Sequence, residues 1–456
     1  MTRYAYKDNA VGNLSTGIST GDLTLVLDSG DGAAFPSPTV TAPAILTLVQ
    51  YSTPTDPTSS VVYYEKINVT VRSTDTLTAT ERGVGDTTAH TFNEGDYIYL
   101  NMTEDFITGV YAELDAGLDP LQTNYVIDGG FTDWQSGTSF VDPAGYTSTL
   151  TQIAYGADGG TNPTLTHTQQ TDAGESFYRI AASGAGSGYG TDSNYTMRHN
   201  VYQGARRLGG AGKYVTVTFE AKSDIGSKKI GVTTQQYYGT GGSPSATDIL
   251  GGGEFTLTSS WAEYTVTVAA ATLSGKIFGT AINDRMILDF IPEYGATYGS
   301  TYFGAAGAED FVGAGNIDIR RVRLHSGSTS YAFVQDDQGT LDAKIKKFYV
   351  KTFARANAPG TASDTNTIFI NGLSTSSVQK AWTVRLDTHM IGTPTLTVYD
   401  YAGNSGKWAE LSTTGVSTEN QAYTSATRIS SNGFLIYKNA STTPGFQFHY
   451  VLDARL

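Results

Sequence analysis

The chain has 456 residues with 52 Gly, 29 Tyr and no Cys, and its formal net charge is -14. A hydrophobic core rarely grows past about 250 to 300 residues, so we expect several domains and divide the sequence into three. The acidic charge argues against a nucleic-acid partner, and the absence of Cys excludes disulfides and thiolate metal sites.

Residues 1–102 are predicted to form a small β-barrel or sandwich. Polar and apolar residues alternate around Leu23, Leu25 and Leu27, as in a half-buried strand. Further strands are predicted at 45–49, 63–71, 76–80 and 96–100. The start of the chain is polar and no run of about 18 apolar residues occurs, so we expect no cleaved export signal and no membrane insertion.

Residues 103–122 carry the pattern of a short helix between two β modules. Asn101 is a candidate cap, and Glu104 stands at the capping-box position. The apolar residues near heptad spacing are Ile107, Val110, Leu114 and Leu121. Such a helix either packs on the following domain or forms a bundle with copies from neighbouring subunits, and the second reading predicts a homotrimer.

Residues 123–333 are predicted to form a jelly-roll sandwich, the largest domain of the chain. The segment opens with VIDGGFTDW at Val126–Trp134, and about eight strands of alternating polarity follow. These strands are predicted at 176–181, 214–221, 230–235, 253–257, 261–269, 286–291 and 316–324.

Residues 334–350 are predicted to be a linker or short helix, and residues 351–456 a third β domain, a sandwich. Its markers are AWTVRL at 381–386, TPTLTVYDYAGNSGKW at 393–408 and GFLIYKN at 433–439. The predicted fold class is therefore mostly β, with serial β-barrel and β-sandwich (jelly-roll) domains joined by a short helix.

The order of these segments resembles bacteriophage tail-fibre and appendage proteins. Residues 1–102 are similar to an N-terminal virion-attachment module through GDLTLVLDSGDGAAFP, the turn at Arg82 and Gly83, and Thr87–His90. The loop Thr53–Ser60 is longer than in that module. Residues 123–333 resemble carbohydrate-binding jelly rolls in the Asp-Gly-Gly-Phe-x-x-Trp opening, and residues 351–456 resemble a C-terminal module that follows such jelly rolls.

The resemblance implies a structural virion protein, a tail fibre or appendage subunit assembled in the bacterial host cytoplasm. It would attach to other virion proteins through residues 1–102 and display its other domains to a host cell-surface glycan. Two alternatives stay open, a capsid head fibre or decoration protein and a glycan-degrading tailspike-like enzyme. A bacterial surface lectin is disfavoured by the expected lack of an export signal.

Residues able to carry chemistry are few, so we predict a protein that is not an enzyme, with no catalytic residue, no metal site and no cofactor. The six His residues are scattered without metal-ligand spacing, and no G-x-S-x-G elbow occurs. A hydrolase would need a carboxylate pair. The carboxylates of the jelly roll that come into question are Glu263, Asp289, Glu293, Glu309 and Asp310. A structural calcium stays open, with oxygen ligands from Asp133, Asp142, Asp158 or Asp284.

Exposed aromatic rings are the candidate glycan-binding groups, because a flat ring can stack on the apolar face of a sugar. The residues predicted for this role are Tyr237, Tyr238, Tyr298, Tyr302 and Trp134. Trp134 lies in a strand-adjacent motif and also reads as a core residue. Aromatic loops are equally typical of subunit interfaces.

Overall fold

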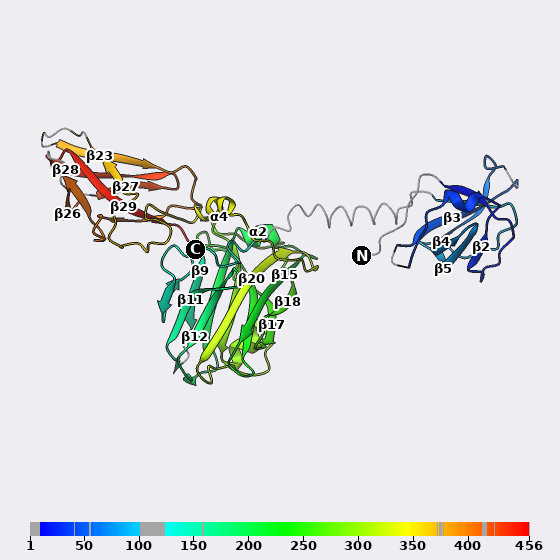
Figure 1. Cartoon of the computed structure of the whole chain (residues 1–456), viewed down its shortest axis with the longest axis horizontal. Coiled ribbons are helices and arrows are strands. Elements are labelled where there is room, and N and C mark those ends of the chain that lie inside the picture. Colours follow the sequence, from blue (N-terminus) through cyan, green and yellow to red (C-terminus); the bar gives the residue numbers. More distant parts are fainter. Residues whose placement is uncertain are drawn as a thin grey trace. The chain divides into compact units, whose positions relative to one another are not determined.

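The computed structural model of the chain describes residues 10–40, 42–53, 56–100, 124–156, 159–371, 373, 376, 378–412, 417–423 and 425–455. They fall into two compact units that divide between Thr123 and Asn124, and each unit is described by itself (Figure 1). The helix predicted at 103–122, and with it the basis for a homotrimer, lies outside the described residues. No helix in the described part has the length and apolar character needed to cross a membrane.

The first unit contains a six-stranded antiparallel sheet with the order β1-β6-β3-β4-β5-β2. The elements are β1 (Val11–Asn13), β2 (Thr24–Val26), the 3-10 helix η1 (Asp31–Ala34), β3 (Ala44–Tyr51), β4 (Val61–Ser73), β5 (Thr76–Val84) and β6 (Tyr97–Tyr99). The strands predicted at 45–49, 63–71 and 76–80 are confirmed. The strand predicted at 96–100 is β6, which is shorter than predicted. Their alternation follows the core, since Leu46, Leu48 and Ile67 are buried.

A buried carboxylate organises the turn that the sequence marks with Arg82 and Gly83. Glu65 is fully buried and accepts hydrogen bonds from the Arg82 guanidinium at 2.5 and 2.7 Å. It also accepts from the backbone N–H groups of Gly83, at 3.0 Å, and His90, at 2.9 Å. This pairing offsets the free-energy cost of burying both charges, and it fixes the turn to the sheet of the first unit.

The second unit contains a sandwich of two six-stranded sheets, each named here after a central strand (Figure 1). The β20 sheet consists of β18 (Ala262–Ala269), β15 (Tyr214–Ser223), β20 (Gly315–Ser326), β12 (Glu175–Ala182), β11 (Leu165–Asp172) and β7 (Ser139–Val141). The β19 sheet consists of β17 (Asp248–Thr256), β16 (Lys229–Tyr237), β19 (Arg285–Tyr294), β14 (Asn194–Tyr202), β9 (Thr151–Gly156) and β8 (Gly145–Tyr146). The pairings are antiparallel throughout the described ladders, and the mostly β fold class is confirmed.

Alternation along the strands explains why the two sheets pack face to face. On β15, Val215, Val217 and Phe219 are buried in the same core as Met286 and Phe290 of β19. Because neighbouring side chains on a strand point to opposite faces, the residues between them lie on the outer faces of the sandwich. Smaller elements border these sheets, namely β10 (Gly159–Thr161), β13 (Ser187–Tyr189), α2 (Gly204–Leu208) and α3 (Ala296–Phe303).

The motif VIDGGFTDW, at the start of the second unit, packs against the sandwich core. The Asp128 carboxylate accepts hydrogen bonds from the backbone N–H groups of Thr132, at 2.7 Å, and Asp133, at 2.9 Å. This turn places Phe131 in the core, fully buried. The motif therefore has a structural role, and its two Gly residues allow close approach: a Cβ on Gly130 would lie 1.9 Å from Oε1 of Gln335.

The C-terminal part packs on the sandwich within the same unit. It contains α4 (Gln338–Ile345), β21 (Tyr349–Lys351), β22 (Ile368–Ile370), β23 (Val378–Arg385), β24 (Thr395–Tyr399), β25 (Trp408–Leu411), β26 (Ser417–Gln421), β27 (Ser425–Ser430), β28 (Gly433–Ser441) and β29 (Gly445–Asp453). One sheet has the order β21-β29-β25-β26, with β22 and β24 also paired to β29, and the other has the order β23-β28-β27.

Two cations join this part to the sandwich. Lys351 Nζ donates to the backbone carbonyls of Gln135 at 2.5 Å, Arg355 at 2.9 Å and Asn357 at 2.6 Å. Arg355 Nε donates to Asp133 Oδ2 at 3.0 Å, and Asp133 is fully buried. Because these partners come from both sides of the predicted linker at 334–350, that segment is a packed joint.

The sandwich core also contains a chain of polar groups centred on His167. Its Nδ1 lies 2.8 Å from the Tyr178 hydroxyl and its Nε2 lies 2.7 Å from the Tyr195 hydroxyl. The Tyr178 hydroxyl lies a further 2.6 Å from Thr147 Oγ1. Burial lowers the pKa of His167 to about 3, so the folded protein holds this imidazole neutral.

We therefore predict that acidification destabilises the second unit through His167. In the unfolded chain the imidazole binds a proton below its ordinary pKa of about 6.5, whereas the folded pKa is about 3. Stability is therefore lost as the pH falls through this window. Between pH 5.5 and 4 the free energy of unfolding should fall by about 1.4 kcal/mol more per pH unit than in a His167→Gln variant. Urea titrations followed by Trp fluorescence measure this unit alone, since all four Trp lie beyond residue 124. Equal slopes for both proteins would contradict the prediction.

Candidate functional site

Two of the predicted glycan-binding rings are enclosed by the core. Trp134 is 4% exposed, and its indole Nε1 donates to the Phe131 carbonyl at 3.0 Å. Tyr238 is 0% exposed, and its hydroxyl donates to Asp248 Oδ2 at 2.5 Å. A ring packed on both faces cannot stack on an outside ligand, so the structure removes Trp134 and Tyr238 from the candidate set.

The other three tyrosines lie on the outer face of the β19 sheet. Tyr298 and Tyr302 stand one turn apart on α3 and stack on each other, with ring centroids 4.2 Å apart and planes at 14°. The Thr233 hydroxyl donates to the Tyr302 carbonyl at 2.9 Å and ties α3 to β16. Gly231 permits this packing, because a Cβ there would lie 2.3 Å from the Phe303 ring.

Tyr237 lies at the end of β16, and Arg285 covers one face of its ring. The Arg285 guanidinium carbon is 4.5 Å from the ring centroid, which is cation–π distance. The Arg285 Nε is buried and has no hydrogen-bond partner in the described part of the chain. Tyr237 is itself partly exposed. The sheet therefore presents one aromatic group on α3 and another on β16.

A row of polar side chains crosses the sheet and ends at β16, the strand that carries Tyr237 and contacts α3. Gln152, Arg198, Asp289 and Thr233 occupy directly paired positions on four adjacent strands, β9, β14, β19 and β16. At a strand spacing of about 4.8 Å, this row spans roughly 14 Å. Gln235 lies beside it on β16 and donates from Nε2 to Asp289 Oδ2 at 3.1 Å.

A bidentate ion pair holds this row in place. Arg198 Nε and Nη2 donate to the two Asp289 oxygens at 2.7 and 2.8 Å. Burial lowers the pKa of Arg198, but the adjacent Asp289 carboxylate more than offsets this effect and holds the pKa above its ordinary value. Burial, followed by the Asp289 carboxylate, raises the pKa of the Tyr298 hydroxyl. Thr233 and Asp289 are fully buried, whereas Gln152 and Arg198 are partly exposed. The face therefore presents a fixed cation and an amide that can bind the oxygens of a polyhydroxylated ligand.

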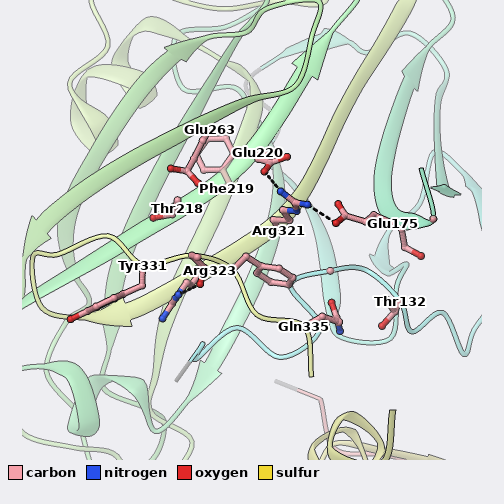
Figure 2. A pocket seen from close by; sticks show the side chains of 15 residues that line it. Thr132, Glu175, Thr218, Phe219, Glu220, Glu263, Arg321, Arg323, Tyr331 and Gln335 are labelled. Atoms are coloured by element: carbon pink, nitrogen blue, oxygen red, sulfur yellow. Dashed lines mark hydrogen bonds and ion pairs between the residues drawn. The ribbon is translucent and has the colours of Figure 1, made fainter. Parts of the chain in front are cut away.

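A second site, which sequence reasoning missed, is a cavity of about 430 Å³ on the outer side of the β20 sheet (Figure 2). Arg321 lies at its centre and bridges two carboxylates, with 2.5 Å contacts to Glu220 Oε1 and Glu175 Oε1. Glu263, Arg323, Tyr331 and Gln335 are among the remaining lining residues. The sequence NIDIRRVRL, which places three Arg in the single strand β20, could have indicated a charged site on this sheet.

The carboxylates proposed for hydrolysis are distributed over three places. Glu263 lines the cavity, Asp289 pairs with Arg198, and Glu309 contacts the buried Lys228 at 2.9 Å. Glu293 is fully buried, and burial raises its pKa to about 7. The fifth carboxylate, Asp310, offers its backbone carbonyl to Lys228 at 2.8 Å. The five residues are therefore not brought together as one catalytic group.

The acidic residues proposed for calcium have other partners. Asp133 pairs with Arg355, Asp284 pairs with Arg206 at 2.7 Å, and Asp142 accepts from the Leu165 N–H at 2.7 Å. Asp158 lies outside the described residues. Within the described ranges, no group of three or more His, Asp or Glu side chains is arranged to hold a metal ion.

No family model and no curated protein sequence matches the chain. Solved structures that match part of it are carbohydrate-binding modules. The N-terminal cellulose-binding domain of Cellulomonas fimi β-1,4-glucanase C is 15% identical, with a TM-score of 0.24 over 40% of this chain and 90% of that chain. The family 11 module of Clostridium thermocellum, in complex with a mixed-linked tetrasaccharide, is 9% identical, with a TM-score of 0.23 over 43% and 99%.

A xylan-binding domain from Paenibacillus barcinonensis is 8% identical, with a TM-score of 0.22 over 44% of this chain and 93% of that chain. These scores and identities are too low to assign a ligand.

Substitution of adjacent tyrosines should separate the buried ring from the accessible one. Tyr238→Ala removes a fully buried aromatic side chain, which typically costs about 3 to 5 kcal/mol. Tyr237→Ala should cost less than about 1 kcal/mol, because this ring lies at the surface. Thermal unfolding followed by Trp fluorescence measures both effects. A larger loss for Tyr237→Ala than for Tyr238→Ala would show that the assignment of the two rings is inverted.

Proposed function

We propose that the second unit binds a glycan along the outer face of the β19 sheet. The observation that carries this proposal is the polar row from Gln152 to Thr233, which ends at β16. The Tyr298–Tyr302 pair and Tyr237 lie beside that end of the row. Sugar rings have apolar faces and hydroxyl edges, so they suit a surface with aromatic rings beside a row of fixed donors and acceptors.

The rigidity of this face favours binding. The Arg198–Asp289 pair and Gln235 are held by hydrogen bonds before any ligand arrives, so little side-chain entropy remains to be lost. Arg285, which is partly exposed, adds a second cation beside Tyr237. The length of roughly 14 Å along the row favours an extended oligosaccharide over a single sugar.

The alternative function on this unit is glycan hydrolysis. Glu293 has the raised pKa of a general acid, about 7. It is fully buried, however, and Asp289, on the outer face, is paired with Arg198. We propose binding without turnover, and a reducing-end assay with host polysaccharide separates the two functions.

The glycan-binding face can be tested with single aromatic substitutions. Tyr298→Ala and Tyr302→Ala should each weaken binding on a glycan array or in affinity electrophoresis by roughly tenfold, as expected for an aromatic anchor of an interface. Tyr214→Ala is the matched control, because Tyr214 is 46% exposed on the other sheet. Equal binding by all three variants and the unchanged protein would exclude this face.

We further propose that the chain is a subunit of a bacteriophage fibre or appendage, with the first unit attached to other virion proteins. The resemblance of residues 1–102 to a virion-attachment module supports this setting. An exposed apolar groove on the first unit also supports it, with Val61 at 52%, Val62 at 47% and Tyr64 at 55% exposure. Exposed apolar patches on small domains are typical of interaction surfaces.

The virion setting predicts that a charge in this groove blocks incorporation. Tyr64→Asp should leave the second unit folded but remove the chain from purified phage particles, as measured by mass spectrometry of the particles. Tyr214→Asp, on the second unit, should be incorporated normally. If Tyr64→Asp particles carry the chain at the usual level, the groove is not the attachment surface. Labelling with antibodies under the electron microscope then distinguishes a tail fibre from a head fibre or decoration protein.

A further inference from the structure

The cavity on the β20 sheet lies on the opposite side of the sandwich from the proposed glycan-binding face. Its floor is formed by β15, β18 and β20, with Thr218, Glu220 and Glu263 pointing into it (Figure 2). Its roof is the segment 331–335, which follows β20. At about 430 Å³, the cavity has the size of a small-molecule site.

Most charges in and around the cavity neutralise one another. Arg321 contacts Glu220 and Glu175 at 2.5 Å, and the neighbouring Arg320 contacts the same two carboxylates at 2.7 and 3.3 Å. Two cations and two anions thus form a closed quartet. The donors of Arg321 are directed at these carboxylates, so the quartet is poorly suited to bind an anion.

Glu263 is the exception among the charged residues of this cavity. It lies directly opposite Glu220 in the β15–β18 ladder, where like charges repel. Glu220 is compensated by the two arginines, but Glu263 is exposed and, among the described residues, has no hydrogen-bond or ion-pair partner. One open carboxylate therefore remains beside a second carboxylate.

The cavity roof adds aromatic surface to this carboxylate. Tyr331 and Phe333 line it, and both are partly exposed. Arg323 is only 1% exposed, donates to the Ala332 carbonyl, and lies 5.2 Å from the Tyr331 ring centroid. Its charge is therefore directed at the roof segment, and Glu263 remains the exposed carboxylate of the lining without an ion-pair partner among the described residues.

We propose that this cavity binds a small ligand carrying a primary ammonium group, with the ammonium at Glu263 and the body of the ligand under Tyr331 and Phe333. An ammonium supplies the donors that Glu263 lacks, and aromatic rings stabilise a nearby cation. Two kinds of ligand share this chemistry, an amino sugar and a simple alkylamine such as a lysine side chain. The site is independent of the β19 face and goes beyond the function proposed for it.

Ligand-observed NMR titration of the full chain at pH 7 tests the proposal with four probes: glucosamine, N-acetylglucosamine, glucose and n-propylamine. Glucosamine or propylamine should bind, and Glu263→Gln should weaken that binding by roughly tenfold or more, because the amide oxygen of Gln carries no negative charge to attract the ammonium. The matched control is Glu94→Gln, which removes the same charge from an exposed position on the first unit. Tyr298→Ala should leave amine binding unchanged.

Binding of glucosamine alone identifies an amino sugar, and comparable binding of propylamine identifies a simple amine; either result supports the site. Equal binding of glucosamine and N-acetylglucosamine overturns the proposal, since the acetylated probe carries no charge. Absence of binding by both amines, or binding that Glu263→Gln leaves unchanged, also overturns it. Because Glu263 is exposed, unpaired and opposite Glu220, Glu263→Gln should melt at the same temperature as the unchanged protein or slightly above it.

Discussion

The sandwich depends on one constraint: each strand must bury alternate side chains against the opposite sheet. Val215, Val217 and Phe219 meet this requirement from one sheet, and Met286, Leu288 and Phe290 meet it from the other. The residues between them are driven to the outer faces, where they can carry charge. Both proposed sites lie on these faces, so the packing of the core determines which residues are available to a ligand.

A break in the alternation creates the charged quartet of the cavity. The ladder between β15 and β20 shifts register between Thr218 and Glu220, and Arg321 has a positive φ of 52°. Such a bulge places one extra residue on the strand and re-aims its side chains. Arg320 and Arg321 can therefore both reach Glu220 and Glu175, which a regular strand would not allow for consecutive residues.

The C-terminal part stiffens the unit through buried polar contacts. Burial lowers the pKa of Lys351 to about 8, yet its ammonium is surrounded by three backbone carbonyls. Asp133 pairs with Arg355 from the same opening motif that places Phe131 in the core. The motif thus serves the core and the joint together. Because the joint is filled by these contacts, a ligand is more easily bound on the outer faces of the two sheets.

The sequence by itself determined the mostly β class and many strands of the sandwich, because a period of two in polarity is a local property. It did not reveal β14, whose NYTMRHNVY carries Arg198, because polar residues on the outer face obscure its alternation. Only the tertiary structure decided that Tyr238 is buried and Tyr237 accessible, since adjacent strand residues face opposite sides and the sequence does not say which side is the core. The same holds for Asp289 and Glu263. Strand pairing brings Arg198 to Asp289, whereas it places Glu263 opposite Glu220, another carboxylate.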